Sequence, residues 1–398
     1  MSVRTEAPST EGFSVAKAAA HPPVAGDTAP VRVAIVGLGW AGRSIWLPRL
    51  NTHPRFTVAA AVDIDPQARA ALAMDPAGAA GIRVLDDPSL LRPDEIDLAV
   101  VAVPNHLHSR IAGALLAGGV SVFLEKPVCL SSAEAAELAA AEQEGGAVLL
   151  AGSAARHRAD VRALYDLSAH CGPLRHVSLG WVRARGIPDA GGWFTDARRS
   201  GGGALLDLGW HLLDVAAPLL GSAVFEQVVG TVSADFLGDG AHGAAWRTVG
   251  RDQLAAGRFG DVEDTARGFL ITDSGVSVSL QACWASHEAL DSTVIKVEGG
   301  AGTAQLTCTF GFSSNRRDGS VLTHVRDGET AEVPVAAEPV GAEYLRQIDE
   351  LPALLADPGS RGRAVAEALR AVHAIERLYD SARRPPAAPA GAGSGNPR

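Results

Sequence analysis

A glycine-rich turn between a strand and a helix is the feature that most constrains the fold of this chain. The β-branched run VRVAIV at Val31–Val36 ends directly in GLGWAG at Gly37–Gly42, and Ser44–Leu50 can continue as a helix. This order fits the G-x-G-x-x-G pattern, in which glycine permits an unusual turn and lets the backbone approach a pyrophosphate at the helix N-terminus. In a chain with 44 glycines a plain turn is the alternative, so the neighbouring sequence must decide.

Apolar runs and helical segments alternate after this turn. The apolar runs are Val58–Val62, Leu98–Val103, Val120–Leu124 and Ala147–Leu150, and the helical segments include Ile111–Ala117 and Ala133–Glu142. Such alternation predicts a parallel, doubly wound sheet. We therefore expect an α/β Rossmann domain that binds a dinucleotide over residues 31–152.

An acidic residue ends the second of these runs. Asp63 lies 26 residues after Gly37, close to where a carboxylate accepts hydrogen bonds from the adenosine ribose of a dinucleotide. Asp63 and Asp65 would also repel a 2′-phosphate, so we expect NAD as the cofactor in preference to NADP. The alternative is that Asp63 only caps the next turn.

Polar residues follow two further strands, where ligands bind in doubly wound sheets. Val103 runs into Pro104-Asn105-His106-Leu107-His108, and Leu124 runs into Glu125-Lys126-Pro127. The two histidines have no third metal ligand nearby, so loop hydrogen bonding is favoured over zinc and no metal site is expected.

Lys126 is a candidate acid–base group. Of the 35 basic residues only Lys17, Lys126 and Lys296 are lysines. Lysine, unlike arginine, can share a proton near neutral pH when it is buried. A lysine at a strand end beside the expected cofactor is therefore predicted to take part in the chemistry.

The pattern changes after Gly152 and indicates a second, α+β domain over residues 153–383. Gly201–Gly203 opens an apolar helix at Ala204–Leu220, in which Asp207 and His211 are four residues apart. Four residues turn a helix by about 400°, so the two side chains are expected to touch, and the carboxylate should raise the proton affinity of the imidazole. The alternative is a structural pair in a buried helix.

Several motifs together resemble the Gfo/Idh/MocA oxidoreductases, a family that includes glucose–fructose oxidoreductase and inositol dehydrogenases. These motifs are the glycine loop, the PNxxH segment, the EKP triplet and GGGALLDLGWHLLD at residues 201–214. The resemblance covers Val31 to Arg383. It implies a large, open, mostly antiparallel sheet in the second domain, used for substrate binding and for assembly into a homodimer or homotetramer.

The resemblance also implies the site residues. Lys126, Asp207 and His211 are expected around the reacting carbon. The cofactor is expected to contact Gly37, Gly39, Trp40, Ala41, Asp63, Pro104, Asn105, His108, Glu125 and Lys126. Substrate choice is expected to depend on Gly186–Thr195 and on a loop insertion at Gly238–Asp261.

The expected function is NAD-dependent hydride transfer to or from a secondary hydroxyl or ketone of a sugar, inositol, aminosugar or aminocyclitol, in secondary metabolism. His211 would take the hydroxyl proton and Lys126 would polarise the oxygen. Two alternatives share the fold: a glycosidase with transient redox, and a non-catalytic ligand sensor. A sensor has no need of all three residues.

Composition excludes other classes. The net charge of −10 argues against a nucleic-acid or anionic-membrane surface. No apolar run reaches the roughly 18 residues of a membrane helix. The four cysteines form no C-x-x-C, which fits a reducing cytoplasm. Residues 1–30 show no signal peptide, and they and residues 384–398 are expected to be disordered tails.

Overall fold

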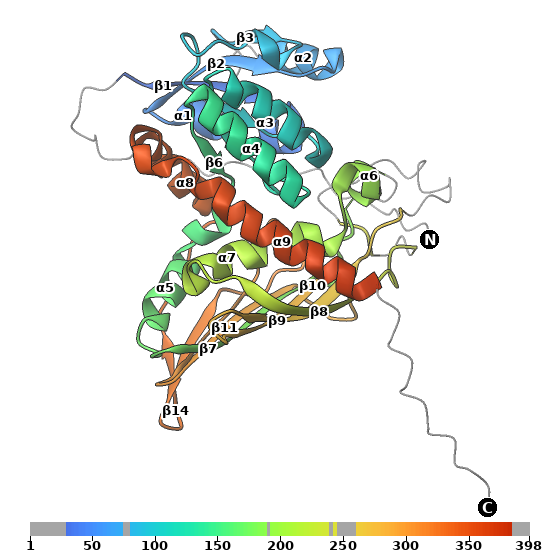
Figure 1. Ribbon diagram of the computed structural model, residues 1–398, viewed down its shortest axis with the longest axis vertical. Coiled ribbons are helices and arrows are strands. Elements are labelled where there is room, and N and C mark those ends of the chain that lie inside the picture. Colours follow the sequence, from blue (N-terminus) through green and yellow to red (C-terminus); the bar gives the residue numbers. More distant parts are fainter. Residues whose placement is uncertain (1–28, 75–79, 189–191, 239–241, 245–259, 384–398) are drawn as a thin grey trace, which may run out of the picture.

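Two sheets with helices between them form the body of the protein (Figure 1). The computed structural model describes residues 29–74, 80–188, 192–238, 242–244 and 260–383. The expected terminal tails lie outside the described residues, apart from residues 29 and 30.

The first sheet has six parallel strands in the order β3-β2-β1-β4-β5-β6. Its strands are β1 (Val31–Val36), β2 (Phe56–Val62), β3 (Arg83–Leu85), β4 (Leu98–Val101), β5 (Ser121–Leu124) and β6 (Leu149–Ala151). β1 pairs with β2 on one side and with β4 on the other, so the winding direction reverses between β1 and β4. A crevice at such a reversal is where doubly wound sheets bind ligands, and the predicted Rossmann architecture is confirmed.

The helices of this half follow the strands as the alternation predicted. They are α1 (Leu47–Thr52), α2 (Pro66–Ala73), α3 (His108–Ala117) and α4 (Ser132–Gly145), with 3-10 turns η2 (Pro88–Leu90) and η3 (Asn105–Leu107). The helix expected at Ser44–Leu50 is longer, because the π-helical segment η1 (Ala41–Trp46) leads directly into α1.

The second sheet has eight strands in the order β14-β13-β12-β11-β7-β10-β9-β8. They are β7 (Leu174–Val182), β8 (Phe225–Ser233), β9 (Thr265–Thr272), β10 (Ser277–Cys283), β11 (Ser292–Gly299), β12 (Thr303–Cys308), β13 (Val321–Arg326) and β14 (Glu329–Val333). Only the β7–β10 pair is parallel among these described strands. This confirms the large, mostly antiparallel sheet.

Alternating burial shows which face of this sheet meets the helices. Val278, Leu280 and Ala282 of β10 are buried, whereas Ser279 and Gln281 between them are only partly buried. The helical layer consists of α5 (Ala159–Ser168), α6 (Ala197–Ser200), α7 (Trp210–Leu220), α8 (Ala342–Ala356) and α9 (Arg363–Arg383), with η4 (Ala154–His157), η5 (Trp193–Thr195) and η10 (Pro358–Ser360). In Figure 1 these helices lie on the upper side of the sheet, and its other face is open.

Two late helices join the halves of the molecule. α9 contacts α4 of the first half as well as α7 and β8 of the second. Ile348 and Leu351 of α8 lie in one apolar core with Val33 and Ile35 of β1. α8 therefore packs against the first sheet.

One helical stretch, Ala197–Leu220, is long and apolar enough by composition to cross a membrane. However, 67% of its apolar window is buried inside the protein. Its α7 part packs between β7 and α9. Core packing accounts for its apolar composition.

Candidate active site

A cavity of about 1190 Å³ is lined by residues from both halves of the molecule. It includes every residue that the sequence placed in the site: Gly37, Gly39, Trp40, Ala41, Asp63, Pro104, Asn105, His108, Glu125, Lys126, Asp207 and His211. The structure thus brings these residues to one place, while their individual roles stay predictions.

The glycine loop forms a cradle at the carboxyl end of β1. Gly37 has a φ of +96°, and a Cβ there would lie 2.4 Å from the Ala102 carbonyl oxygen. A Cβ on Gly42 would lie 1.9 Å from the Gly37 carbonyl oxygen. Gly39, by contrast, has no described atom within 4 Å of where its Cβ would be. The protein itself requires the first and third glycines, and the second leaves open space that fits a dinucleotide pyrophosphate.

Asp63 binds this loop. Its Oδ2 accepts a hydrogen bond from the Leu38 N–H at 2.7 Å, and its Oδ1 accepts one from the Asp65 N–H at 2.8 Å. Asp65 in turn caps α2 by accepting from the Gln67 N–H. Asp63 therefore holds the next turn, as the alternative stated, and also reaches the glycine loop. Two bonds leave about half of the acceptor capacity of a carboxylate for ribose hydroxyls.

Asn105 and His108 connect loops. The Asn105 Nδ2 donates to the Ser200 carbonyl oxygen of α6 at 2.9 Å. The ring nitrogens of His108 lie 2.6 Å from the Pro127 oxygen and 2.9 Å from the Val103 oxygen. His108 is only 1% exposed, and burial lowers the pKa of its imidazole. This geometry suits a group that positions the Glu125–Pro127 segment.

Lys126 and Asp207 form an ion pair in the cavity. The Lys126 Nζ lies 2.6 Å from Asp207 Oδ1, and the side chains are 19% and 12% exposed. The other carboxylate oxygen, Oδ2, accepts a hydrogen bond from the Trp284 indole at 2.9 Å. Burial opposes the charge of Asp207, but Lys126 and Arg183 outweigh it and hold the pKa of this carboxyl well below its usual range.

Asp207 and His211 form no hydrogen bond or ion pair with each other among the described residues, which corrects the expected pairing. Among the described residues, the two oxygens of Asp207 bond Lys126 and Trp284, and the His211 ring instead lies 5.5 Å from the Trp181 ring, measured between centroids. The reason is local: the π-helical segment η6 (Leu205–Gly209) precedes α7, and its wider turn changes which side chains meet.

Asp207 acts on His211 in the expected direction, but the expected net rise in proton affinity is wrong, because other groups outweigh the carboxylate. Burial and the charge of Lys126 lower the pKa of His211 to about 3, although Asp207 opposes them. The imidazole is therefore neutral throughout the physiological pH range. A neutral imidazole has one ring nitrogen that can accept a hydrogen bond or a proton, although this low pKa makes it a weak base.

Glu125 anchors the strand end that carries Lys126. Its Oε1 accepts a hydrogen bond from the Trp46 indole at 2.6 Å, and its Oε2 accepts one from the Lys126 N–H at 3.1 Å. Burial raises the pKa of the Glu125 carboxyl. Trp46 belongs to η1, so Glu125 ties the lysine to the helix that follows the glycine loop.

Sequence reasoning missed the contribution of the second sheet. Arg183 follows β7, is 8% exposed, and its guanidinium lies 4.9 Å from the Trp181 ring centroid. It adds positive charge beside Asp207 and His211. A charged residue directly after a strand was a usable signal here, as it was for Lys126. Trp284 gave no such signal, because it is a fully buried residue directly after β10 and nothing in the sequence marks its indole N–H as a partner of Asp207.

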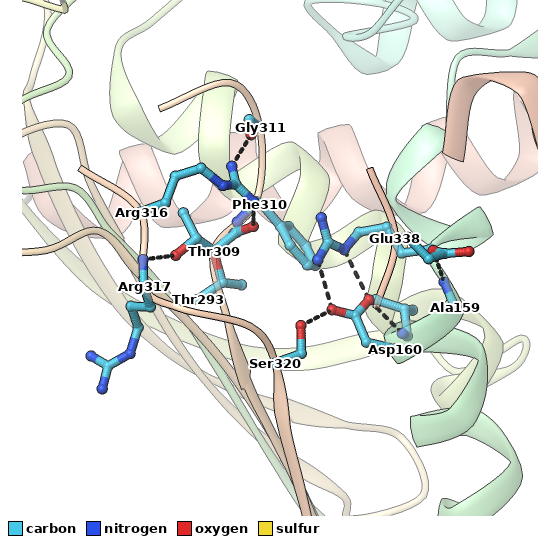
Figure 2. Close-up of polar contacts among 12 residues, drawn as sticks. Ala159, Asp160, Thr293, Thr309, Phe310, Gly311, Arg316, Arg317, Ser320 and Glu338 are labelled. Carbon is cyan, nitrogen blue, oxygen red and sulfur yellow. Dashed lines mark hydrogen bonds and ion pairs between the residues drawn. The ribbon is translucent and has the colours of Figure 1, made fainter. Parts of the chain in front are cut away.

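The segment after β12 supplies another wall. Gly311 and Phe312 line the cavity, and Arg316 donates hydrogen bonds to the carbonyl oxygens of Thr309 and Gly311 (Figure 2). Phe310 lies against Trp181 with ring centroids 5.4 Å apart.

An ion pair supports this wall from behind. Figure 2 shows Asp160 accepting a hydrogen bond from Ser320, at 2.7 Å. The Arg158 Nη2 lies 2.6 Å from Asp160 Oδ2, and the Arg158 guanidinium lies 4.8 Å from the Phe310 ring centroid. The ring contacts therefore run from Arg158 through Phe310 and Trp181 to His211.

The two segments expected to determine substrate specificity are described only in part. Residues 189–191, 239–241 and 245–259 lie outside the described residues. Pro188, Trp193 and Phe194 of the first segment line the cavity. No group of three or more His, Cys, Asp or Glu side chains suited to a metal ion occurs in the described part of the chain.

Comparison with known families agrees with the fold and the cavity. The family model described as "Oxidoreductase family, NAD-binding Rossmann fold" matches residues 31–153, and the "GFO/IDH/MocA C-terminal domain" matches residues 160–305. A protein of Amycolatopsis mediterranei strain S699 named as a UDP-kanosamine synthase oxidoreductase subunit is 60% identical over 352 residues, which is 88% of this chain and 96% of that protein.

More distant relatives act in sugar redox chemistry by name. The D-glucoside 3-dehydrogenase of Escherichia coli K12 is 28% identical over 65% of this chain and 71% of its own length. A dTDP-3,4-didehydro-2,6-dideoxy-alpha-D-glucose 3-reductase of Streptomyces antibioticus is 33% identical over 44% of this chain and 52% of its own length.

Solved structures share the fold. GenD2 from gentamicin A biosynthesis, in complex with NAD, has a TM-score of 0.69 at 23% identity and covers 92% of this chain and 97% of its own. A 3-ketoreductase from Actinomadura kijaniata, in complex with NADP and TDP-benzene, has a TM-score of 0.68 at 20% identity and covers 88% and 98%. With the two matched domains and the 60% identical relative, these findings show that the chain belongs to the GFO/IDH/MocA family and is an NAD(P)-binding oxidoreductase.

Proposed function

We propose that this protein oxidises the hydroxyl at carbon 3 of a hexose carried on a nucleoside diphosphate, with NAD as the hydride acceptor. The observation that carries the proposal is the Lys126–Asp207 ion pair beside His211, in a cavity shared with the glycine cradle. The carrier is suggested by the 60% identical relative, which is named for a UDP-linked amino sugar. Carbon 3 is suggested by the two more distant relatives.

The cavity residues divide the work. The neutral His211 imidazole accepts the hydroxyl proton, and Lys126 donates a hydrogen bond to the same oxygen. Asp207 keeps the ammonium group in place, and Trp284 fixes the carboxylate. The nicotinamide ring, when bound, supplies the hydride-accepting carbon. In the direction of reduction the same groups return the proton.

The choice of NAD over NADP rests on Asp63. Its carboxylate is held against the glycine loop by the Leu38 N–H. In that place it can accept hydrogen bonds from the ribose hydroxyls of NAD, and its negative charge repels the 2′-phosphate of NADP. We expect the Kd for NADP to exceed that for NAD by at least about tenfold, or about 1.4 kcal/mol, in calorimetric titration. Asp63→Ser should reduce this ratio mainly by improving NADP. Tighter binding of NADP by the unaltered protein would refute the assignment.

A spectrophotometric assay tests the reaction. UDP-glucose and dTDP-glucose should produce NADH when hydroxylamine traps the ketone, and glucose, glucosamine and inositol should do so far more slowly. Borodeuteride reduction of the untrapped product should place deuterium at carbon 3. Faster oxidation of a free sugar would contradict the nucleotide carrier. Hydrolysis without net NADH would instead support the transient-redox glycosidase, and binding without turnover would support the sensor.

The ketone also implies a following reaction. Because the 60% identical relative is named a subunit and its product name carries an amine, the proposed fate of the ketone is amino transfer by a second protein. An aminotransferase with its amino donor should then replace hydroxylamine as the trap in the same assay. If no amino donor supported the trap while hydroxylamine still allowed NADH formation, the amino-transfer step would be refuted and the oxidation would stand.

A further inference from the structure

We propose that Arg199, Trp193 and Phe194 form the subsite for the nucleoside diphosphate of the substrate. In this subsite Arg199 binds the diphosphate and the two aromatic rings stack with the base. The inference rests on the proposed function, since it requires a substrate that carries a nucleotide. All three residues line the cavity and belong to the second half of the molecule, on η5 and α6.

Arg199 offers a cation to the cavity. Its side chain is exposed, and among the described residues its guanidinium has no hydrogen bond or ion pair. Arg156 and Arg158, by comparison, are neutralised by carboxylates at 2.6 Å. An arginine without a carboxylate at a cavity wall is free to bind phosphate oxygens through two parallel N–H groups.

The charge distribution along the cavity favours the Arg199 side for an anion. Asp63, Asp65, Asp86 and Asp87 line the wall that belongs to the first half of the molecule. Arg92 and Arg110 also lie on that wall, but the four carboxylates outnumber them. When the sugar lies at Lys126 and His211, its diphosphate therefore meets less electrostatic repulsion beside α6 than beside the wall with the four carboxylates.

The aromatic pair provides an apolar surface on the neighbouring turn η5. The Trp193 and Phe194 rings have centroids 4.0 Å apart, and their planes are inclined by 31°. Both side chains are partly buried. Any nucleobase can stack on an aromatic ring, so this surface can bind a nucleoside without hydrogen bonds that recognise one particular base.

Neighbouring elements hold η5 and α6 from two sides. The Asn105 Nδ2 bonds the Ser200 oxygen from the first half of the molecule. The Asp261 Oδ1 accepts from the Ala197 N–H at 2.7 Å, and Asp196 caps α6 through the Arg198 N–H. Arg199 thus extends from an anchored backbone, which suits a specificity subsite.

The test compares two adjacent arginines. Arg199→Ala should raise the KM for UDP-glucose at least about tenfold and leave kcat within about threefold, with the KM for NAD unchanged. Arg198→Ala is the matched control, because Arg198 is also exposed on α6 but does not line the cavity. Calorimetry with UDP, which needs no turnover, should show the same loss of affinity for Arg199→Ala.

Inorganic pyrophosphate separates the two parts of the subsite. Arg199→Ala should weaken both pyrophosphate and UDP, whereas Trp193→Ala should weaken UDP alone. Wild-type turnover of UDP-glucose with equal KM values in the two arginine variants would overturn the subsite and leave the proposed function standing. Oxidation of free hexoses, with no binding of UDP to the wild type, would overturn both.

Discussion

Lys126 is fixed in the cavity by one carboxylate oxygen, at 2.6 Å. Lys126→Arg keeps the charge but replaces a compact ammonium group with a larger planar group that does not release its proton. We expect kcat to fall by about 10²–10⁴-fold, as for other acid–base groups, with the Kd for NAD nearly unchanged. Lys296→Arg, on β11, is the control and should keep full activity. Turnover of Lys126→Arg within about threefold of wild type would remove Lys126 from the chemistry.

His211 makes the stability of the protein depend on pH. Its pKa is about 3 in the folded protein and about 6.5 when unfolded. Between these values the unfolded chain binds a proton that the native protein does not. The free energy of unfolding is therefore highest above pH 6.5. It falls by about 1.4 kcal/mol per pH unit as the pH decreases from 6.5 towards 3.

Urea unfolding at pH 7 and pH 5 measures this loss. Wild type should lose about 2 kcal/mol more than His211→Gln between these two pH values, because the variant has no imidazole to protonate. Equal losses in the two proteins would show that His211 is not held neutral. The same pKa predicts that the rate of oxidation does not change near pH 6.5 through protonation of His211.

The sequence located the candidate catalytic residues better than it located their hydrogen-bond partners. Lys126, Asp207 and His211 follow from strand ends, residue type and helical spacing, and all three line one cavity. The partner of Asp207 did not follow, because a π-helical turn alters the spacing rule and Trp284 arrives from a strand that is distant in sequence.

At the scale of elements, the helix that carries Asp207 and His211 begins on a buried carboxylate. Glu263 accepts hydrogen bonds from the Gly203 N–H at 3.0 Å, from the Leu205 N–H at 2.9 Å and from the Tyr379 hydroxyl at 2.8 Å. A Cβ on Gly203 would lie 1.8 Å from the Glu263 carbonyl oxygen, which accounts for glycine there. A negative charge at a helix N-terminus is also favoured by the helix dipole.

Removing this cap should loosen the catalytic helix. Glu263→Ala leaves two helix N–H groups and one hydroxyl without their partner, so the free energy of unfolding should fall by about 2–4 kcal/mol. Tyr379→Phe removes only one of the three bonds and should cost about 1 kcal/mol. Urea unfolding measures both. A loss below about 0.5 kcal/mol in Glu263→Ala would mean that the cap does not hold the helix.

Element types were predictable where periodicity is strong. The strand–helix order of the first half predicted its parallel sheet correctly, whereas the second sheet was expected from the family resemblance. The π-helical starts of α1 and α7 were not predictable, since nothing in residue spacing distinguishes a wide turn from a regular one. The packing of α8 against β1 was not predictable either, because the two elements are about 300 residues apart and local sequence patterns do not show which distant elements meet.

For the whole molecule, the open face of the second sheet remains without a covering layer in one chain (Figure 1). Val229 of β8 and Phe269 of β9 are paired neighbours on this face and are 59% and 44% exposed. The face also carries the Lys296–Glu298 ion pair, at 2.5 Å, and several small polar side chains on β10. Apolar contacts flanked by both signs of charge suit contact with an identical surface.

We propose that a second copy of the chain covers this face. Phe269→Glu would place an unpaired carboxylate on the face of each copy, at a site that must lose water on assembly. We expect light scattering after size exclusion to show a dimer or tetramer for wild type and a monomer for Phe269→Glu. Leu369→Glu is the control: Leu369 is 41% exposed, but it lies on α9, on the helical side of the sheet, so the variant should keep the wild-type mass. A monomeric wild type, or an unchanged mass for Phe269→Glu, would exclude this face as the interface, because a carboxylate without a partner could not be buried there.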